Sequence, residues 1–496
     1  MTSTSQPTKP SSQPAISVQS VASYRQSSDA IVKNLEQLIS ELPTNSLALF
    51  GQPPVRSQPY PEWPVFDERD VAAVANVVLS GQWGGIPSPG SHAETFAHQF
   101  VSMQCGSDQK RDSCAVLVAN GSLTLEVALR AANIGWGDEV IVPAYTFQAT
   151  AAAPITAGAI PIIVDIDPET YCISPAAIEA AISPKTKAII PVHLGAQMAD
   201  MDAIMDIAQR HNLIVIEDCA HAHGAQWNGQ GAGTIGHFGS FSLQSNKILT
   251  TGEGGVLLCR TQDLAARAES IVNCGRLPQA TSTETLSNTP PASALSEILT
   301  KFIHFNGQEP AFSMGTNYRM TQFQAALGSI ALERFSAQVE AREAMLNYLE
   351  LQLPNVPGIR VLNPQTQHTK RSFYRYIFAI DPAIFGVVHN EVCLALQSEG
   401  IPCSTGYPAM HRYSLFQPQR SRLPVPSIFP ERFDLESMRF PEAERACEQE
   451  AIWLDESVFR AGKQGIDDVI ASLLKVQQQS ATLAAAKAAF LERMWP

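Results

Sequence analysis

One lysine lies in a sequence context that favours chemistry over a place on the surface. Lys247 follows the aromatic and polar run Phe241–Asn246 and precedes the glycine-rich turn Gly252–Gly255. Most lysines are solvated, but these apolar and glycine-rich flanks predict a partly desolvated amine. Such an amine forms Schiff bases with carbonyl compounds. Lys247 is therefore the first candidate catalytic residue.

A run of acids and histidines forms the second candidate. The apolar segment Leu213–Ile216 leads directly into Glu217 and Asp218, and His221 and His223 follow. In an open α/β sheet, polar residues just after a strand lie where ligands bind. Asp218 and the two histidines could suggest a metal cluster, but the sequence has neither a His pair four residues apart, as in HExxH, nor a nearby Cys pair. We predict no metal site.

Two glycine-containing segments raise the question of phosphate binding. Ala115–Val118 is followed by Asn120-Gly-Ser122, which could open a helix whose free N–H groups hold a phosphate. The same residues are also compatible with a simple Ser N-cap beside a turn glycine. The segment Gly231–Gly236 satisfies GxGxxG, but it follows a polar loop and opens no helix, so we discount a dinucleotide fingerprint.

The elements around these residues indicate an α/β fold. Between residues 114 and 260, short β-branched runs alternate with helical segments. Strands that are apolar on both faces and are each followed by a helix predict a mostly parallel sheet flanked by helices. A long helix is expected at 322–352, and the apolar runs at 375–380 and 391–398 predict a smaller α+β domain.

Length and composition exclude several classes of protein. The chain has 496 residues, of which 45% are hydrophobic and 16% charged. Its sequence has no uninterrupted apolar run of about 18 residues, the length needed to span a bilayer. A net charge of −13 makes nucleic acid a poor partner. The nine cysteines are odd in number and form no CxxC pair, which favours a reducing, cytoplasmic compartment.

The ends and one internal stretch interrupt the pattern. The first 28 residues contain nine serines and no acid, so we predict a disordered N-terminal tail over 1–45. A Ser-rich, acid-poor start also matches part of the transit-peptide description, but only Lys9 and Arg25 are basic where many arginines are expected. A loop inserted at about 276–312 is expected, and the Ala-rich end predicts a helical tail over 476–496.

Six motifs, in order along the chain, resemble the DegT/StrS family of sugar aminotransferases, which are pyridoxal-phosphate enzymes of fold type I. The resemblance covers roughly residues 60–475. The motifs are 120–125 with 137–147, 164–167, 191–195, 217–224, 240–247 with 251–255, and 317–326. The resemblance implies a large cofactor-binding α/β domain over 60–345 and a small C-terminal α+β domain over 346–475.

The resemblance also implies roles for individual residues. Lys247 matches the lysine that bonds to the cofactor and later carries the substrate proton. Asp218 matches the carboxylate paired with the pyridine nitrogen, where a fixed negative charge keeps that nitrogen protonated. Phe147 matches the aromatic residue that stacks on the cofactor ring, and His221 matches the Gln-or-His position beside it.

Four further positions match the phosphate-binding part of the family site. Ser122, the Leu123 backbone N–H and Ser242 resemble the phosphate cup. Asn317 resembles a side chain that reaches the phosphate of the neighbouring subunit's cofactor, which implies a homodimer with shared active sites. The expected insertion lies just before Asn317, so the subunit-crossing loop could differ in geometry.

Substrate-side residues are the least defined part of the resemblance. His193, Tyr318, Tyr407 and His411 are candidate substrate contacts, although Tyr407 and His411 are equally compatible with ordinary loop positions. The blocks 245–250, 400–408 and 452–456 are most similar to the branch acting on keto-inositols and aminohydroxybenzoate precursors.

The function that the resemblance implies is a transamination. We expect an aminotransferase that moves an amino group from glutamate or glutamine to a ketone on a sugar or cyclitol, with both substrates using one site in turn. An aminohydroxybenzoate-type synthase or dehydratase on the same cofactor is the alternative, although family dehydratases of deoxysugars generally carry His at the Lys247 position. A non-catalytic regulatory protein that binds the cofactor is a third reading.

Overall fold

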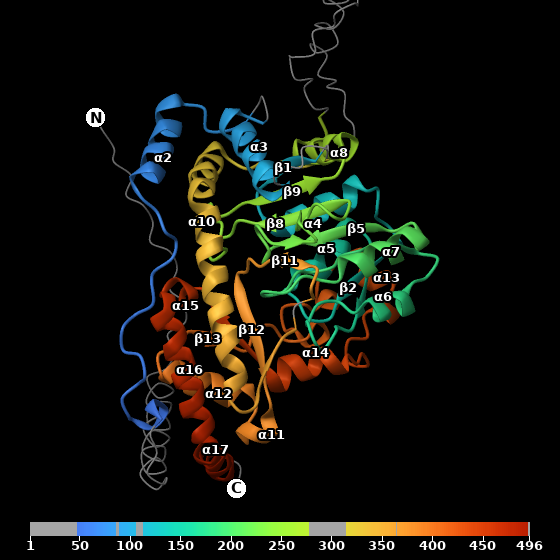
Figure 1. Ribbon diagram of the computed structural model, residues 1–496. Helices are drawn as coiled ribbons and strands as arrows, with labels where there is room; N and C mark the ends of the chain where they lie inside the picture. The colour runs from blue at the N-terminus through green and yellow to red at the C-terminus, as the bar shows by residue number, and fades with distance from the viewer. Residues whose placement is uncertain (1–46, 86–88, 106–112, 277–313, 364, 495–496) are drawn as a thin grey trace, which may run out of the picture.

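Two sheets joined by one long helix organise the described part of the chain (Figure 1). The computed structural model describes residues 47–85, 89–105, 113–276, 314–363 and 365–494. The predicted tail 1–45 and nearly all of the predicted insertion 276–312 lie outside these residues. Among the helices described, none is long and apolar enough to cross a membrane.

The larger sheet has seven strands in the order β1-β9-β8-β5-β4-β2-β3. All its strands run parallel except β9, which pairs antiparallel with both β1 and β8. The strands are β1 (Cys114–Val118), β2 (Glu139–Pro143), β3 (Ile160–Val164), β4 (Thr186–Ile189), β5 (Ile214–Asp218), β8 (Phe238–Ser242) and β9 (Gly255–Cys259). The predicted α/β class with a mostly parallel sheet is confirmed.

Helices cover both faces of this sheet because its strands are apolar on both sides. Successive strand residues point to opposite faces, so Val140 and Val142 pack with α4, α5 and α8, while Ile141 packs with α3, α6 and α7. These helices are α3 (Ser91–Cys105), α4 (Gly121–Ala131), α5 (Ala149–Ala157), α6 (Pro175–Ala181), α7 (Met201–His211) and α8 (Gln262–Val272).

The smaller lobe is built on a four-stranded antiparallel sheet in the order β10-β12-β14-β13. Its strands are β10 (Ile359–Val361), β12 (Arg375–Ile380), β13 (Cys403–Ser404) and β14 (Ala451–Asp455). The helices of this part of the chain are α11 (Pro382–Phe385), α12 (His389–Ser398), α13 (Pro424–Ile428), α14 (Pro441–Arg445), α15 (Ser457–Arg460), α16 (Gly462–Gln478) and α17 (Ser480–Met494). A small sheet of β7 (Gln230–Gly231), β6 (Gln226–Trp227) and β11 (His368–Lys370) pairs the two parts of the chain.

Helix α10 (Gln322–Gln352) connects the two lobes. Thr321 and Gln324 form a capping box at its start, and the helix then packs first against α2 (Glu68–Ser80) and α3, and further along against α15 and α16 (Figure 1). The expected domain boundary at 345/346 therefore falls inside one continuous helix.

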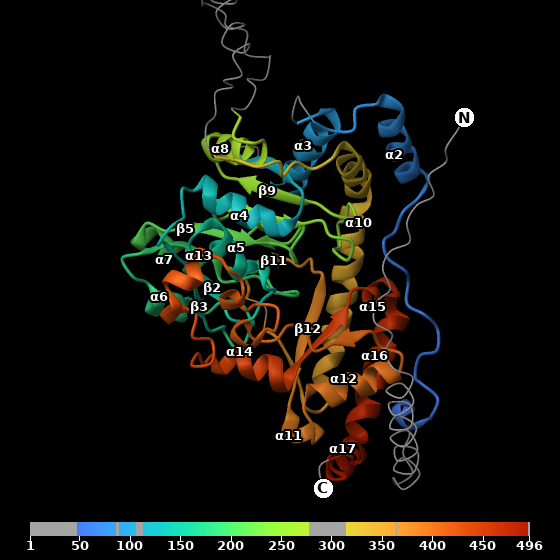
Figure 2. The ribbon, with the colours of Figure 1, turned by 180° about the vertical axis from the view of Figure 1, so that it is seen from behind.

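The N-terminal described segment lies along the smaller lobe (Figure 2). Leu47 is fully buried in the apolar cluster of that lobe, and the N–H groups of Ala48 and Val55 donate to the carboxylate of Glu399 at 2.8 and 3.0 Å. The segment then runs toward the larger sheet and enters α2. Residues 47–63 thus form a second connection between the two lobes, in addition to α10.

Candidate active site

The carboxyl ends of the parallel strands meet at one cavity of about 660 Å³. Strand β5 ends at Asp218, β8 ends at Ser242, and the segments that follow β1 and β2 bring in Ser122 and Phe147. The cavity is also lined by Leu123, His221, Lys247 and Tyr407. Eight of the twelve residues singled out from the sequence therefore share one pocket.

Lys247 occupies a tight turn after β8, where its backbone N–H donates to the Gln244 carbonyl oxygen at 2.8 Å. Its amine lies 4.1 Å from the centre of the Tyr374 ring. The pKa of Lys247 is lowered to about 7: desolvation is the main cause, the Asp218 carboxylate opposes it, and the positive charge of Arg375 adds to it. A large share of this amine is therefore neutral, and nucleophilic, near neutral pH.

Asp218 is 7% exposed and held by two hydrogen bonds. Thr150 donates its hydroxyl to Oδ2 at 2.9 Å, and the Ala220 N–H donates to Oδ1 at 3.2 Å. Burial raises the pKa of Asp218, while these donors and the charge of Lys247 act in the opposite direction. A carboxylate in this state gains from a cationic partner in the pocket, since its desolvation is then compensated.

The His221 ring is held as a neutral donor. The Gly195 N–H donates to Nδ1 at 3.3 Å, which leaves the ring proton on Nε2, 3.5 Å from the Tyr407 hydroxyl. Burial, followed by the charges of Lys247 and Arg375, lowers the pKa of His221 well below its usual range. Across the pocket, Phe147 is 40% exposed and lies 5.7 Å from Tyr407 between ring centres.

The start of α4 forms the polar end of the pocket. Asn120 caps the helix by accepting the Leu123 N–H at 2.9 Å, so the reading of Ser122 as the N-cap is wrong. The same bond means that the Leu123 N–H, expected in a phosphate cup, already has a partner. A Cβ at Gly121 would lie 2.6 Å from the Ser242 Cβ, so this glycine lets α4 approach β8 closely.

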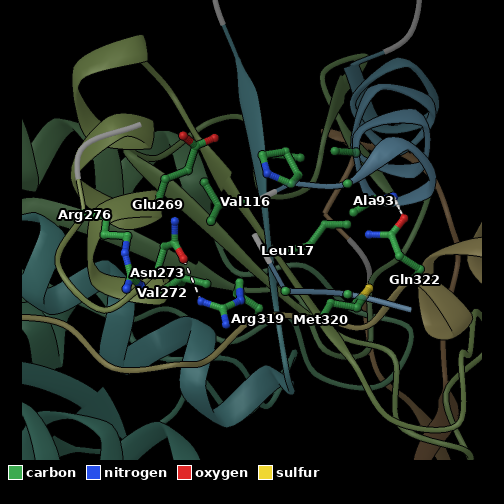
Figure 3. A pocket seen from close by; sticks show the side chains of 16 residues that line it. Ala93, Val116, Leu117, Glu269, Val272, Asn273, Arg276, Arg319, Met320 and Gln322 are labelled. Atoms are coloured by element: carbon green, nitrogen blue, oxygen red, sulfur yellow. Dashed lines mark hydrogen bonds between the residues drawn. The ribbon is translucent and has the colours of Figure 1, made fainter. Parts of the chain in front are cut away.

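Asn317 and Tyr318 lie outside this pocket, in the segment before α10. Asn317 is exposed, and Tyr318 is turned so that its hydroxyl meets Glu126 at 3.4 Å. The neighbouring Arg319 donates to Asn273 at 2.6 Å and lines a different, smaller pocket (Figure 3). That pocket holds about 60 Å³, far less than the 660 Å³ of the cavity at the strand ends.

His193 does not reach the pocket because it is part of a fully buried hydrogen-bond network. Its Nε2 lies 3.0 Å from Glu217 Oε2. The Glu217 carboxylate also accepts the N–H groups of Gly233, Ile235 and Gly236 at 2.7 to 2.8 Å. The GxGxxG segment therefore wraps a carboxylate of the protein itself.

His193, Glu217 and Cys219 also bring three potential metal ligands within 4.8 Å of one another. The four hydrogen bonds to Glu217 use both of its oxygens, so the geometry is explained without a metal ion.

His411 is likewise held away from the pocket, since its Nε2 pairs with Glu444 Oε1 at 3.0 Å. Three side chains of the site were missed from the sequence: Thr150, which binds Asp218, and Tyr374 and Glu253, which line the pocket. Thr150 lies in the first turn of α5, three residues after Phe147, a signal that could have been used. Tyr374 comes from the smaller lobe, and no local pattern marks it.

These groups fit a phosphorylated pyridine aldehyde. The partly neutral amine of Lys247 suits the aldehyde, and the desolvated carboxylate of Asp218 suits a protonated ring nitrogen. The hydroxyls of Ser122 at the start of α4 and of Ser242 at the end of β8 suit a phosphate. A cavity of about 660 Å³ is within the usual range for cofactor sites.

Comparisons with known proteins agree with this fit. Residues 64–458 match the DegT/DnrJ/EryC1/StrS aminotransferase family. A protein of Streptoalloteichus tenebrarius, provisionally named L-glutamine:3-amino-2,3-dideoxy-scyllo-inosose aminotransferase, is 39% identical over 440 residues, which cover 88% of this chain and 98% of that protein. The L-glutamine:scyllo-inosose aminotransferase of Streptomyces griseus is 33% identical, over 87% of this chain and 97% of its own.

Among solved structures, 3-amino-5-hydroxybenzoic acid synthase superposes with a TM-score of 0.69 at 25% identity. The match covers 86% of this chain and all of that one.

Proposed function

Because this chain belongs to the DegT/DnrJ/EryC1/StrS aminotransferase family, we propose that it uses pyridoxal phosphate to transfer the amino group of L-glutamine to a ketone carbon of a cyclitol. The observation that carries this proposal is that one cavity is lined by the amine of Lys247, whose pKa is lowered to about 7, and by the buried carboxylate of Asp218. The names of the relatives from Streptoalloteichus and Streptomyces support glutamine as donor and an inosose as acceptor.

The cofactor, when bound, supplies an aldehyde that condenses with amines and a ring that takes up an electron pair. The chain's own residues do the rest. Asp218 would keep the ring nitrogen protonated, since its carboxylate gains from a cationic partner. Lys247 would hold the aldehyde end of the cofactor, and its amine would act as the base that takes the α-proton of the donor and returns it.

The other pocket residues position the cofactor. Phe147 would cover one face of its ring, and His221, with its proton on Nε2, would lie beside the ring. Ser122 and Ser242 would hold the phosphate. Tyr407 is the remaining candidate for contact with the substrates, because His193, Tyr318 and His411 point into other surroundings.

Asn317 has its role between subunits in this proposal. Its side chain is exposed in the single chain, as expected for a group that completes the phosphate site of a partner. The active unit is then a homodimer with shared sites. Helix α2 carries exposed apolar side chains, including Val71 at 63% and Leu79 at 83% exposure. An apolar patch of this kind supports a subunit interface near α2. We place the enzyme in the cytoplasm, in keeping with its nine scattered cysteines.

The two substrates use one site in turn. The donor leaves as its 2-oxo acid before the ketone enters, so initial rates measured against both substrates should give parallel double-reciprocal lines. Intersecting lines, which indicate a complex holding both substrates, would overturn this order of events.

A second candidate function is a synthase that removes water and forms an aromatic ring on the same cofactor. The similarity to 3-amino-5-hydroxybenzoic acid synthase favours it. The two are separated by product analysis: an amino transfer gives an aminocyclitol and one 2-oxo acid per turnover, whereas the synthase gives an aromatic product and no 2-oxo acid. A binding-only regulatory role is disfavoured, because it has no chemical need for both Lys247 and Asp218.

A further inference from the structure

Tyr374 lies within cation–π distance of two cationic side chains. The Lys247 amine is 4.1 Å, and the Arg375 guanidinium carbon 4.4 Å, from the centre of the Tyr374 ring. The ring also meets His221 edge-on at 4.8 Å. Such distances are well within the roughly 6 Å over which an aromatic face attracts a cation.

The two cations differ in how they are compensated. Arg375 forms an ion pair with Asp455 at the end of β14, and its Nη2 donates to the Tyr374 hydroxyl at 3.2 Å. The Tyr374 N–H donates to the His221 carbonyl oxygen at 3.2 Å. Arg375 and the backbone therefore fix the ring, and the ring in turn faces the one cation whose charge changes during the reaction.

We propose that Tyr374 is a catalytic residue whose ring face stabilises the protonated form of Lys247, the form that carries the substrate proton between its two positions. This rests on the proposed function of Lys247. Because Tyr374 directly precedes β12, this contact joins the smaller lobe to the reactive lysine.

Other charged and titratable groups also face Lys247. Asp218 on β5 favours the ammonium form, while Arg375 on β12 disfavours it. Neutral His221 and Tyr407 and the carboxylate of Glu253 complete the surroundings. All of these remain when Tyr374 alone is changed, so a change in the titration of Lys247 can be traced to the ring.

The test measures how fast the full-length protein, free of cofactor, bonds to added pyridoxal phosphate as a function of pH. Only the neutral amine reacts, so the rate should rise with pH, with a midpoint near 7. In Tyr374→Leu the ammonium form loses the ring, so the midpoint should fall by roughly one pH unit. In Tyr374→Phe the ring is kept, and the midpoint should stay where it is in the wild type.

Tyr348→Leu is the matched control, because it removes a tyrosine ring that lies 5.1 Å from another lysine amine, that of Lys463, outside the pocket, and it should leave the midpoint unchanged. A midpoint in Tyr374→Leu that stays or rises, with a wild-type melting temperature, would overturn the role of Tyr374. If Tyr374→Leu does not fold, a midpoint that falls in Tyr374→Phe would overturn it as well. A wild-type protein that never bonds to the cofactor would instead sink the proposed function itself.

Discussion

The indole Nε1 of Trp63 donates a hydrogen bond of 2.8 Å to the carbonyl oxygen of Ser245, two residues before Lys247. The Trp63 ring is flanked by the guanidinium groups of Arg342 and Arg460, 5.8 and 5.3 Å from its centre, and both bind Glu456. Trp63 immediately precedes the part of the chain that matches the family. A segment outside that match therefore supports the turn that carries the reactive lysine.

Replacing Trp63 by Phe should loosen this turn. Phe keeps a ring for the two arginines but loses the bond to Ser245, which is worth about 1 kcal/mol in stability. We expect a small decrease in the free energy of unfolding and a lower kcat, because Lys247 is held less firmly. Chemical denaturation and steady-state rates measure the two effects. Trp136→Phe, at an exposed indole, is the control and should change neither.

Asp218→Asn should separate cofactor binding from turnover. The amide keeps the shape of the carboxylate but not its charge, so turnover should fall on the order of a hundredfold or more, the scale of losing one preorganised electrostatic contact. Because Asp218 raises the pKa of Lys247, that pKa should also fall below 7, which the pH dependence of cofactor attachment measures. Asp206→Asn, at an exposed ion pair, should behave as wild type.

Glu217→Gln should destabilise the protein more than its conservative nature suggests. An amide can accept from only some of the three backbone N–H groups that now point at the carboxylate, and its own NH₂ meets further donors. A loss of roughly 2 to 3 kcal/mol in the free energy of unfolding is expected. Glu179→Gln, at an exposed ion pair that solvent screens, should leave the free energy of unfolding nearly unchanged. Equal effects of the two substitutions would contradict this reading of Glu217.

Asn317 and Lys247 should complement each other between subunits. Lys247→Ala removes the reactive amine, and Asn317→Asp places a negative charge against the neighbouring phosphate. If sites are shared, a hybrid dimer has one site with both residues intact, so a mixture of the two inactive variants should regain up to about a quarter of wild-type activity. Activity that stays at the sum of the separate variants would show that each chain uses its own Asn317.

Local sequence was sufficient to single out candidates beside the end of a strand. Asp218 ends one strand of the larger sheet and Lys247 follows another, where ligands bind, while their roles were implied by the family resemblance. The alternation of side chains along β5 also explains why Asp218 faces the pocket while adjacent Glu217 faces the other side. His193 was expected to contact substrate, because only the folded structure shows that its ring is bonded to buried Glu217. Tyr374 was missed because β12 brings it beside Lys247 across 127 residues of sequence.

The most direct measurement of the central claim is the absorbance spectrum of the protein loaded with pyridoxal phosphate, before and after adding L-glutamine, beside Lys247→Ala. We predict a visible band of lysine-bound cofactor that glutamine removes, with one 2-oxo acid formed per site, and no such band in the variant. A wild-type band that persists in glutamine and in every other amino donor, or a variant that turns over like the wild type, would contradict the assignment of Lys247 and the aminotransferase reaction with it.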